Sequence, residues 1–344
     1  MSGGEILFER RGRAGLVTLN RPEALNALTS GMVHALHGQL REWAVDPDIA
    51  RVVVRAAGDR AFCAGGDIRA LHDWGRAGDP RILEFYRDEY RLDTFVKRFP
   101  KPYVSLIDGI VMGGGVGISV HGSHRLGTEA TMFAMPETGI GLFPDVGGTY
   151  FLPRMPGRIG TWEALTGARL GQADALEAGV LTHAVARDDR DAIVDALCAA
   201  DDVDEALRPF QRSAGEPAVA SHRDAIDRAF SHDTVEAIVE ALAGEGEWGA
   251  ETARTILSKS PTSLKIALRQ MQAGADASFE ECMRTEFRIV SRVVEGHEFY
   301  EGVRAQIIDK DRDPHWDPPS LSGVGDAMVD SYFAPLPGGE LQLD

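Results

Sequence analysis

Two carboxylates, Glu137 and Asp145, stand eight positions apart among residues that bend the backbone. Glu137 follows Pro136, and Asp145 follows Pro144 and precedes Val-Gly-Gly. A carboxylate in an apolar segment rich in proline and glycine is poorly suited to a merely solvated role, so both are candidates for acid–base or nucleophilic chemistry. The residues alone leave a second interpretation open, in which Asp145 caps a loop and Glu137 forms a salt bridge.

A run of three glycines, Gly113-Gly114-Gly115, precedes these carboxylates. Glycines between a strand and a helix allow close backbone approach, and the first amides of a helix have no intrahelical partner. Such amides can hold a developing oxyanion, and the glycines of Cys63-Ala-Gly-Gly-Asp67 could present another. Tight packing of strand on helix is the alternative for the run, and a simple turn is the alternative for the earlier loop.

Other catalytic patterns fail on spacing. A dinucleotide fingerprint needs glycine or alanine where Ile118 stands, and a serine-hydrolase elbow at Ser119 needs glycine where His121 stands. Cys63 has no histidine close in sequence that would favour a nucleophilic thiol. His121 and His124 are three apart, but no carboxylate completes a ligand set, so we expect no metal site.

Short Val/Leu-rich runs bounded by turn residues predict buried strands that alternate with helices in an α/β core. The strands are Ala14–Leu19, Arg51–Ala56 and Tyr103–Ile107, and the helices cover 29–45, capped by Thr29 or Ser30, and Gly114 to about 122. From residue 188 the sequence pattern is typical of helices, and Ser260-Pro261 is a helix start. A further helix carries an apolar stripe along Phe279, Met283, Phe287, Val290 and Val294. We therefore predict a core over 1–187, a mostly helical region over 188–344 packing on it, and an irregular tail from Asp311.

Composition limits the partners. The chain has 344 residues and a net charge of −17, which argues against nucleic acid and anionic membrane surfaces as partners. No apolar run reaches the roughly 18 residues of a membrane span. Three widely spaced cysteines favour reduced thiols and a cytoplasmic location.

In this order, four motifs resemble those of the crotonase, or enoyl-CoA hydratase/isomerase, superfamily. They are Asn20-Arg-Pro-x-x-x-Asn-Ala-Leu28, the loop 63–68, the glycine run and the segment 136–148. The resemblance implies a spiral of ββα repeats, an acyl-CoA thioester substrate, no separate cofactor, and a homo-oligomer such as a trimer or hexamer. By matching positions, the backbone amides of Gly66 and Gly114 form the oxyanion hole.

Gly117 separates this sequence from the hydratases of the superfamily. Hydratases of the superfamily use two glutamates, of which one matches Glu137 and the other falls on Gly117. Long phrases such as Phe133-Ala-Met-Pro-Glu-Thr-Gly-Ile-Gly-Leu-Phe-Pro-Asp145 instead resemble the 3-hydroxyisobutyryl-CoA hydrolase family. That family's substrate contacts fall on Glu89, Gly114, Glu137 and Asp145.

The implied mechanism makes Glu137 the nucleophile or the general base, with Asp145 orienting the substrate hydroxyl. Glu89 is implied as a further substrate contact, on the hydroxyl side. Dienoyl-CoA isomerases of the superfamily also carry Glu and Asp eight residues apart, so isomerisation or hydration stays open as an alternative. A non-catalytic CoA-ester binding protein is the third possibility.

Overall fold

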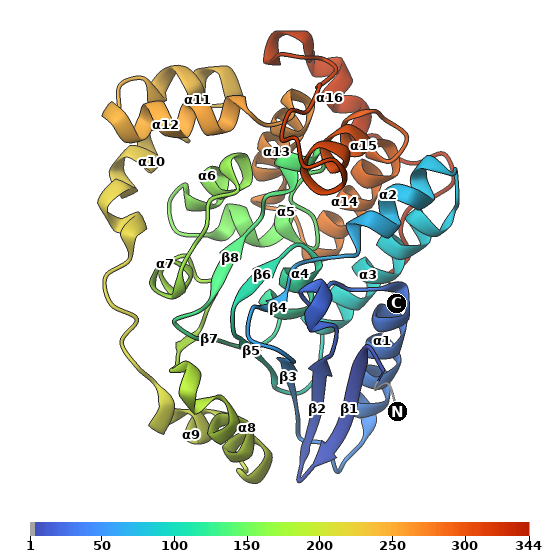
Figure 1. The fold of residues 1–344 in the computed structure, drawn as a ribbon, viewed down its shortest axis with the longest axis vertical. Helices are drawn as coiled ribbons and strands as arrows, with labels where there is room; N and C mark the ends of the chain where they lie inside the picture. Colours follow the sequence, from blue (N-terminus) through green and yellow to red (C-terminus); the bar gives the residue numbers. More distant parts are fainter. Residues whose placement is uncertain (1–3, 344) are drawn as a thin grey trace. The chain divides into compact units, whose positions relative to one another are not determined.

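The computed structural model describes residues 4–343 (Figure 1). The chain divides into two compact units. The first unit comprises residues up to Gly66, Arg91–Phe133 and Arg169–Ala220. The second comprises Asp67–Tyr90, Ala134–Ala168 and the residues from Ser221 onward. Each unit therefore draws on three separate stretches of chain. The predicted division into a core over 1–187 and a mostly helical region over 188–344 stays a prediction.

A six-stranded sheet organises the first unit (Figure 1). Its order is β1 (Ile6–Arg11), β2 (Ala14–Leu19), β3 (Arg51–Ala56), β5 (Tyr103–Ile107), β7 (His124–Gly127) and β9 (His183–Ala184). β1 and β2 form an antiparallel hairpin, and the other neighbours pair in parallel. The three predicted strands are confirmed as β2, β3 and β5, whose Val/Leu side chains are buried.

A second sheet has the order β4 (Ala61–Cys63), β6 (Ile110–Met112) and β8 (Met132–Ala134). Each pair of consecutive strands, β3–β4, β5–β6 and β7–β8, contributes one strand to each sheet. A helix follows the first two of these pairs, and a 3₁₀ helix follows the third. This repetition is the expected spiral of ββα units.

Helices cover the large sheet of the first unit. α1 (Ser30–Val45) begins as predicted, because the hydroxyl of Thr29 accepts a hydrogen bond from the Met32 amide at 3.2 Å. α8 (Arg190–Ala199) and α9 (Val203–Leu207) bury an apolar face in one cluster with residues of β2, β3, β5 and β7. α4 (Gly114–Val120) and α7 (Gln172–Glu177) complete the regular helices of this unit among the described residues.

The second unit is largely helical from Ser221 onward. Ser260 caps α13 (Pro261–Gly274) by accepting from the Ser263 amide at 3.1 Å, and the predicted apolar stripe lies on α14 (Phe279–Val293). The prediction of an irregular tail was wrong in part, because α16 (Asp326–Phe333) forms within it and buries Val329. The other helices are α2 (Ile68–Arg76), α5 (Gly148–Phe151), α6 (Ile159–Thr166), α10 (Arg223–Ala229), α11 (Val235–Leu242), α12 (Gly246–Leu257) and α15 (Glu298–Val303).

α3 (Arg81–Lys97) belongs to the second unit as far as Tyr90 and to the first unit from Arg91. Across residues 4–343, no helix combines the length and the apolar character needed to cross a membrane.

Candidate active site

The segment 136–148 folds into two consecutive tight turns in the second unit. Glu137 opens a 3₁₀ helix (Glu137–Ile140), which ends when the amide of Leu142 donates to the Glu137 carbonyl at 3.0 Å. Asp145 opens the next turn, in which its carbonyl accepts from the Gly148 amide at 2.7 Å. Both side chains are about 95% buried. The proline and glycine spacing thus accompanies two carboxylates that lie inside the protein, where neither side chain is merely solvated.

α3 brings a third carboxylate and two tyrosines to the same place. The hydroxyl of Tyr90 donates to Asp145 Oδ2 at 2.8 Å, and the ring of Tyr90 packs edge-on against that of Tyr86. Glu89 lies between these tyrosines in the chain and is also buried. Sequence reasoning missed both tyrosines, although their i,i+4 spacing is typical of one helix face.

Burial raises the pKa of all three carboxyl groups, and the charge of Asp145 adds to the rise for Glu137 and Glu89. Burial is the largest cause for Glu137, followed by the charge of Asp145, and its pKa lies well above 4.5. The pKa of Glu89 rises well above 4.5 for the same two reasons. Burial raises the pKa of Asp145 to about 7, although the hydrogen bond from Tyr90 opposes this rise. Burial therefore favours the protonated form of each of these carboxyl groups, which suits them to proton transfer.

Three polar atoms of this cluster have no hydrogen-bond partner within residues 4–343. They are Glu137 Oε2, Glu89 Oε1 and the hydroxyl of Tyr86, and all three are buried. Buried polar atoms are usually paired, because burying one without a partner costs about 1–3 kcal/mol. Two acceptors and one hydroxyl placed together are suited to bind a polar substrate group.

Glu163 is a further buried carboxylate that sequence reasoning missed. Its Oε1 accepts from the amide of Met135 at 2.8 Å, which fixes the entry to the Glu137 turn. Burial raises the pKa of Glu163 to about 8, while the neighbouring Lys259 acts in the opposite direction. The charge of Glu163 is one more cause of the raised pKa of Glu137.

The first unit holds the two predicted oxyanion glycines. β4 and β6 run parallel, so the loops that follow them, with Gly66 and Gly114, leave the sheet on the same side. Gly65 has a φ of +111°, and a Cβ there would lie 3.8 Å from the Gly114 nitrogen. The two loops are therefore packed together, which bears out the close backbone approach expected of these glycines.

Gly114 lies at the start of α4, where a helix amide has no intrahelical acceptor. The intrahelical hydrogen bonds begin with Val116 and Gly117, whose amides donate to the Gly113 carbonyl at 2.7 and 3.2 Å. As the first residue of α4, Gly114 precedes that ladder.

The sequence profile of the family described as enoyl-CoA hydratase/isomerase matches residues 14–333. The chain belongs to this family. The 3-hydroxyisobutyryl-CoA hydrolase of Danio rerio, named as mitochondrial, is 46% identical over 353 residues, which cover 99% of this chain and 92% of that protein. The human protein of the same name is 42% identical, with 98% of this chain and 91% of that protein covered.

Two crystal structures share the whole fold. One, described as a carnitinyl-CoA dehydratase from Mycobacterium thermoresistibile, has a TM-score of 0.95 at 40% identity and covers 99% of both chains. The other, described as an enoyl-CoA hydratase from Rhodobacter sphaeroides, has a TM-score of 0.93 at 41% identity and covers 99% of this chain and 100% of that chain. These matches confirm the crotonase-like α/β spiral with its helical C-terminal region.

Gly117 stands where hydratases of the family carry their second glutamate, and the carboxylate of Asp93 occupies the space that a side chain there would need. A Cβ on Gly117 would lie 2.6 Å from Oδ1 and 2.7 Å from Oδ2 of Asp93, a fully buried residue of α3. Such an approach is far inside van der Waals contact, so a glutamate at position 117 requires Asp93 to move. Packing also explains Gly115, whose Cβ would meet the Cys63 carbonyl at 2.3 Å. Packing thus accounts for Gly115 and Gly117, whereas the oxyanion role of Gly114 stays a prediction.

Cys63 and His124 both have polar neighbours within the first unit. Cys63 is fully buried, and its thiol faces the Gly65 carbonyl at 3.6 Å. No group of three or more metal-binding side chains occurs in the part of the chain that the structure describes, and His124 lies 3.2 Å from Asp204.

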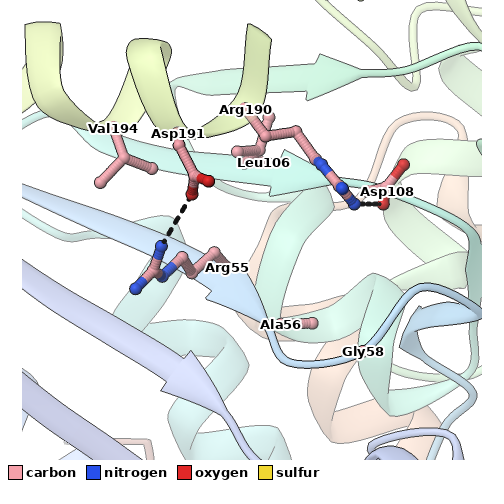
Figure 2. Close-up of a pocket in the computed structure, with 8 residues that line it drawn as sticks. All are labelled: Arg55, Ala56, Gly58, Leu106, Asp108, Arg190, Asp191 and Val194. Atoms are coloured by element: carbon pink, nitrogen blue, oxygen red, sulfur yellow. Dashed lines mark hydrogen bonds and ion pairs between the residues drawn. The ribbon is translucent and has the colours of Figure 1, made fainter. Parts of the chain in front are cut away.

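A cavity of about 190 Å³ in the first unit lies between β3, β5 and α8 (Figure 2). Arg55 pairs with Asp191 at 3.5 Å across it, and Arg190 pairs with Asp108. Its charges thus neutralise one another, and none of the five predicted site residues lines it.

Proposed function

We propose that this chain is a CoA thioester hydrolase that converts 3-hydroxyisobutyryl-CoA and water to 3-hydroxyisobutyrate and CoA. The observation that carries the proposal is that Glu137 is present and buried while the second hydratase glutamate is replaced by Gly117, whose side-chain space Asp93 occupies. A hydratase needs two carboxylates to add water to an alkene, whereas hydrolysis of a thioester needs one nucleophile or base and an oxyanion hole. The names of the relatives that are 42–46% identical over nearly the whole chain agree with this choice.

The amides of Gly66 and Gly114 hold the thioester oxygen in this mechanism. Their hydrogen bonds strengthen as the carbonyl becomes tetrahedral and negative charge collects on the oxygen. Loss of one such donor typically costs on the order of 3 kcal/mol of barrier. The parallel pairing of β4 with β6 supports this role, because it brings both loops to one side of the sheet.

Glu137 supplies the attack on the thioester carbonyl. As nucleophile, its carboxylate forms an anhydride and expels CoA as the thiolate, and water then hydrolyses the anhydride. As general base, it takes a proton from the water that attacks the carbonyl directly. Its unpartnered Oε2 suits both routes, and its raised pKa makes the carboxylate more basic in either one.

Asp145 and Glu89 bind the hydroxyl end of the acyl group. The hydrogen bond from Tyr90 orients the Asp145 carboxylate, and we expect this carboxylate also to accept from the substrate hydroxyl. Glu89 has an unpartnered oxygen and a raised pKa, so it can donate or accept at the same hydroxyl. The cluster thereby selects acyl groups that carry a hydroxyl.

Hydration or dehydration is the second candidate, because the two crystal structures that are 40% and 41% identical carry those descriptions. The isomerase alternative rests on the spacing of Glu137 and Asp145 alone. Binding without catalysis is the third, and the intact Glu137 argues against it.

A free-thiol reagent separates these functions, because only hydrolysis releases CoA thiol. We expect thiol release from 3-hydroxyisobutyryl-CoA by the native chain and none by Glu137→Gln, which should still bind the ester. A single turnover in oxygen-18 water then separates the two routes, since label in Glu137 indicates the anhydride. Tight binding of the ester with no turnover by the native chain would contradict the proposal.

Two further properties stay predictions. The trimer or hexamer implied by the family is checked by light scattering on the eluting protein. The cytoplasmic location rests on three free, buried cysteines, whereas the names of the relatives carry the word mitochondrial, so fractionation of the source cell is the test.

A further inference from the structure

The turn that carries Asp145 is held from behind by a buried carboxylate of α14. Glu286 is fully buried, and its two oxygens accept from two backbone amides of this turn. Oε2 accepts from the amide of Gly147 at 2.8 Å, and Oε1 accepts from that of Thr149 at 2.9 Å. Hydrogen bonds from amides to a carboxylate are among the stronger ones in proteins.

α13 adds a second support through Gln270, which is also fully buried. Its Nε2 donates to the carbonyl of Pro144 at 3.1 Å and to the hydroxyl of Thr149 at 2.7 Å. The residues on either side of Asp145 are therefore fixed by side chains that lie more than 120 positions away in the chain.

The turn needs such support because its backbone is unfavourable. Val146 has a φ of +50°, a left-handed conformation that a β-branched residue rarely adopts. The amide of Thr149 lies in the first turn of α5, where helices leave amides without intrahelical partners. Glu286 satisfies that amide and, through Gly147, holds the strained residue that follows Asp145.

This support is expensive for stability, which points to a functional reason for it. Burial, together with the charge of Asp145, raises the pKa of Glu286 to about 8, although the amide hydrogen bonds oppose the rise. Another buried acid beside Asp145 is thus an unfavourable choice if the only need is to cap a four-residue helix. It is understandable if the orientation of Asp145 has to be fixed.

We propose that Glu286, supported by Gln270, is a positioning residue that sets the orientation of Asp145 toward the substrate hydroxyl. This inference rests on the proposed function, because it assumes that Asp145 reads that hydroxyl. Glu286 itself contacts the backbone of the turn and acts on the substrate only through Asp145.

The test compares kcat/KM for 3-hydroxyisobutyryl-CoA with kcat/KM for isobutyryl-CoA, which lacks the hydroxyl. We expect the native chain to prefer the hydroxylated ester by at least about a hundredfold, because a site built to bind a hydroxyl leaves its polar groups unpaired without it. Asp145→Asn should remove most of this preference. Glu286→Gln should lower it at least about tenfold, because small displacements of a positioned group are costly, while isobutyryl-CoA turnover stays within about threefold.

Ile289→Val provides the matched control, since Ile289 is equally buried on the same helix. It should leave the preference unchanged. If Glu286→Gln fails to fold, Gln270→Met removes the second support and should also lower the preference. The positioning role is wrong if the folded variants keep the native preference or slow both substrates equally. If the native chain itself shows no preference, the assignment of Asp145 fails, and that result is distinct from failure of Glu286 alone.

Discussion

Replacing Asp145 by asparagine should stabilise the protein while it removes recognition of the substrate hydroxyl. Burial raises the pKa of this carboxyl from 3.8 to about 7 in the folded protein. In the unfolded chain the carboxyl returns to water and ionises near its ordinary value. The protonated carboxyl therefore favours folding below pH 3.8, and this stability is lost as the pH rises through the folded pKa.

The size of the effect follows from that difference in pKa. A rise from 3.8 to about 7 corresponds to about 4 kcal/mol of lost stability at pH 7 and above. Asparagine cannot ionise, so it avoids this loss, and its amide oxygen can still accept from Tyr90. The weaker hydrogen bond to a neutral acceptor subtracts about 1 kcal/mol, which leaves a net gain of about 3 kcal/mol.

Thermal melting of both proteins at several pH values between 5 and 8 measures this gain. We expect the variant to melt several degrees above the native chain at pH 8, and the difference to shrink toward pH 5. Asp48→Asn is the control, because the Asp48 side chain is 79% exposed and its replacement should leave the melting temperature nearly unchanged. A variant that melts below the native chain at pH 8 would refute the reasoning, and so would a difference that does not change with pH.

Three further predictions follow, two on this cluster and one on Gly117. Glu137→Gln should lower kcat for thiol release by about 10²- to 10⁴-fold. Its affinity for the CoA ester, measured by calorimetry, should stay unchanged. Normal turnover by this variant would exclude Glu137 from the reaction. Tyr90→Phe removes a hydrogen bond to Asp145, and a bond to a charged group is worth about 1.5–3 kcal/mol. The pKa of Asp145 should then rise above about 7, and the ascending limb of the pH–rate profile should move up by about one to two pH units. An unmoved profile contradicts this. Gly117→Ala should cost about 1–3 kcal/mol in denaturant unfolding, and Asp93→Ala should relieve that cost in the double variant; additive effects would show that the two do not clash.

Features that depend on neighbouring residues could be predicted from the sequence. Thr29 and Ser260 begin their helices because their own hydroxyls accept from amides three residues on. Glu137 and Asp145 are buried because the prolines and glycines around them bend the chain within a few positions. The family resemblance added Glu89, which no local pattern marks.

Residues that act across long separations could not be predicted. Tyr90 meets Asp145 from 55 positions away, and Glu286 meets Gly147 from 139 positions away. α3 carries Tyr90, Glu89 and Asp93 on a helix whose apolar residues alternate with many charges, so its buried face is hard to read from periodicity.

Gly117 is a second case in which the sequence shows a feature but not the contact that explains it. The sequence reveals that the second hydratase glutamate is missing, but only the structure reveals that Asp93 takes its side-chain space. The glycine at position 117 is therefore tied to the packing of α3 against α4 and is more than a single isolated substitution.

The central claim is that this chain breaks a thioester bond and does not hydrate an alkene. The most direct measurement incubates one preparation with 3-hydroxyisobutyryl-CoA and, separately, with crotonyl-CoA, and follows free thiol and loss of enoyl absorbance in parallel. Our account predicts rapid thiol release from the first ester, abolished in Glu137→Gln, and little loss of enoyl absorbance with the second. Efficient hydration of crotonyl-CoA without thiol release from either ester would contradict it.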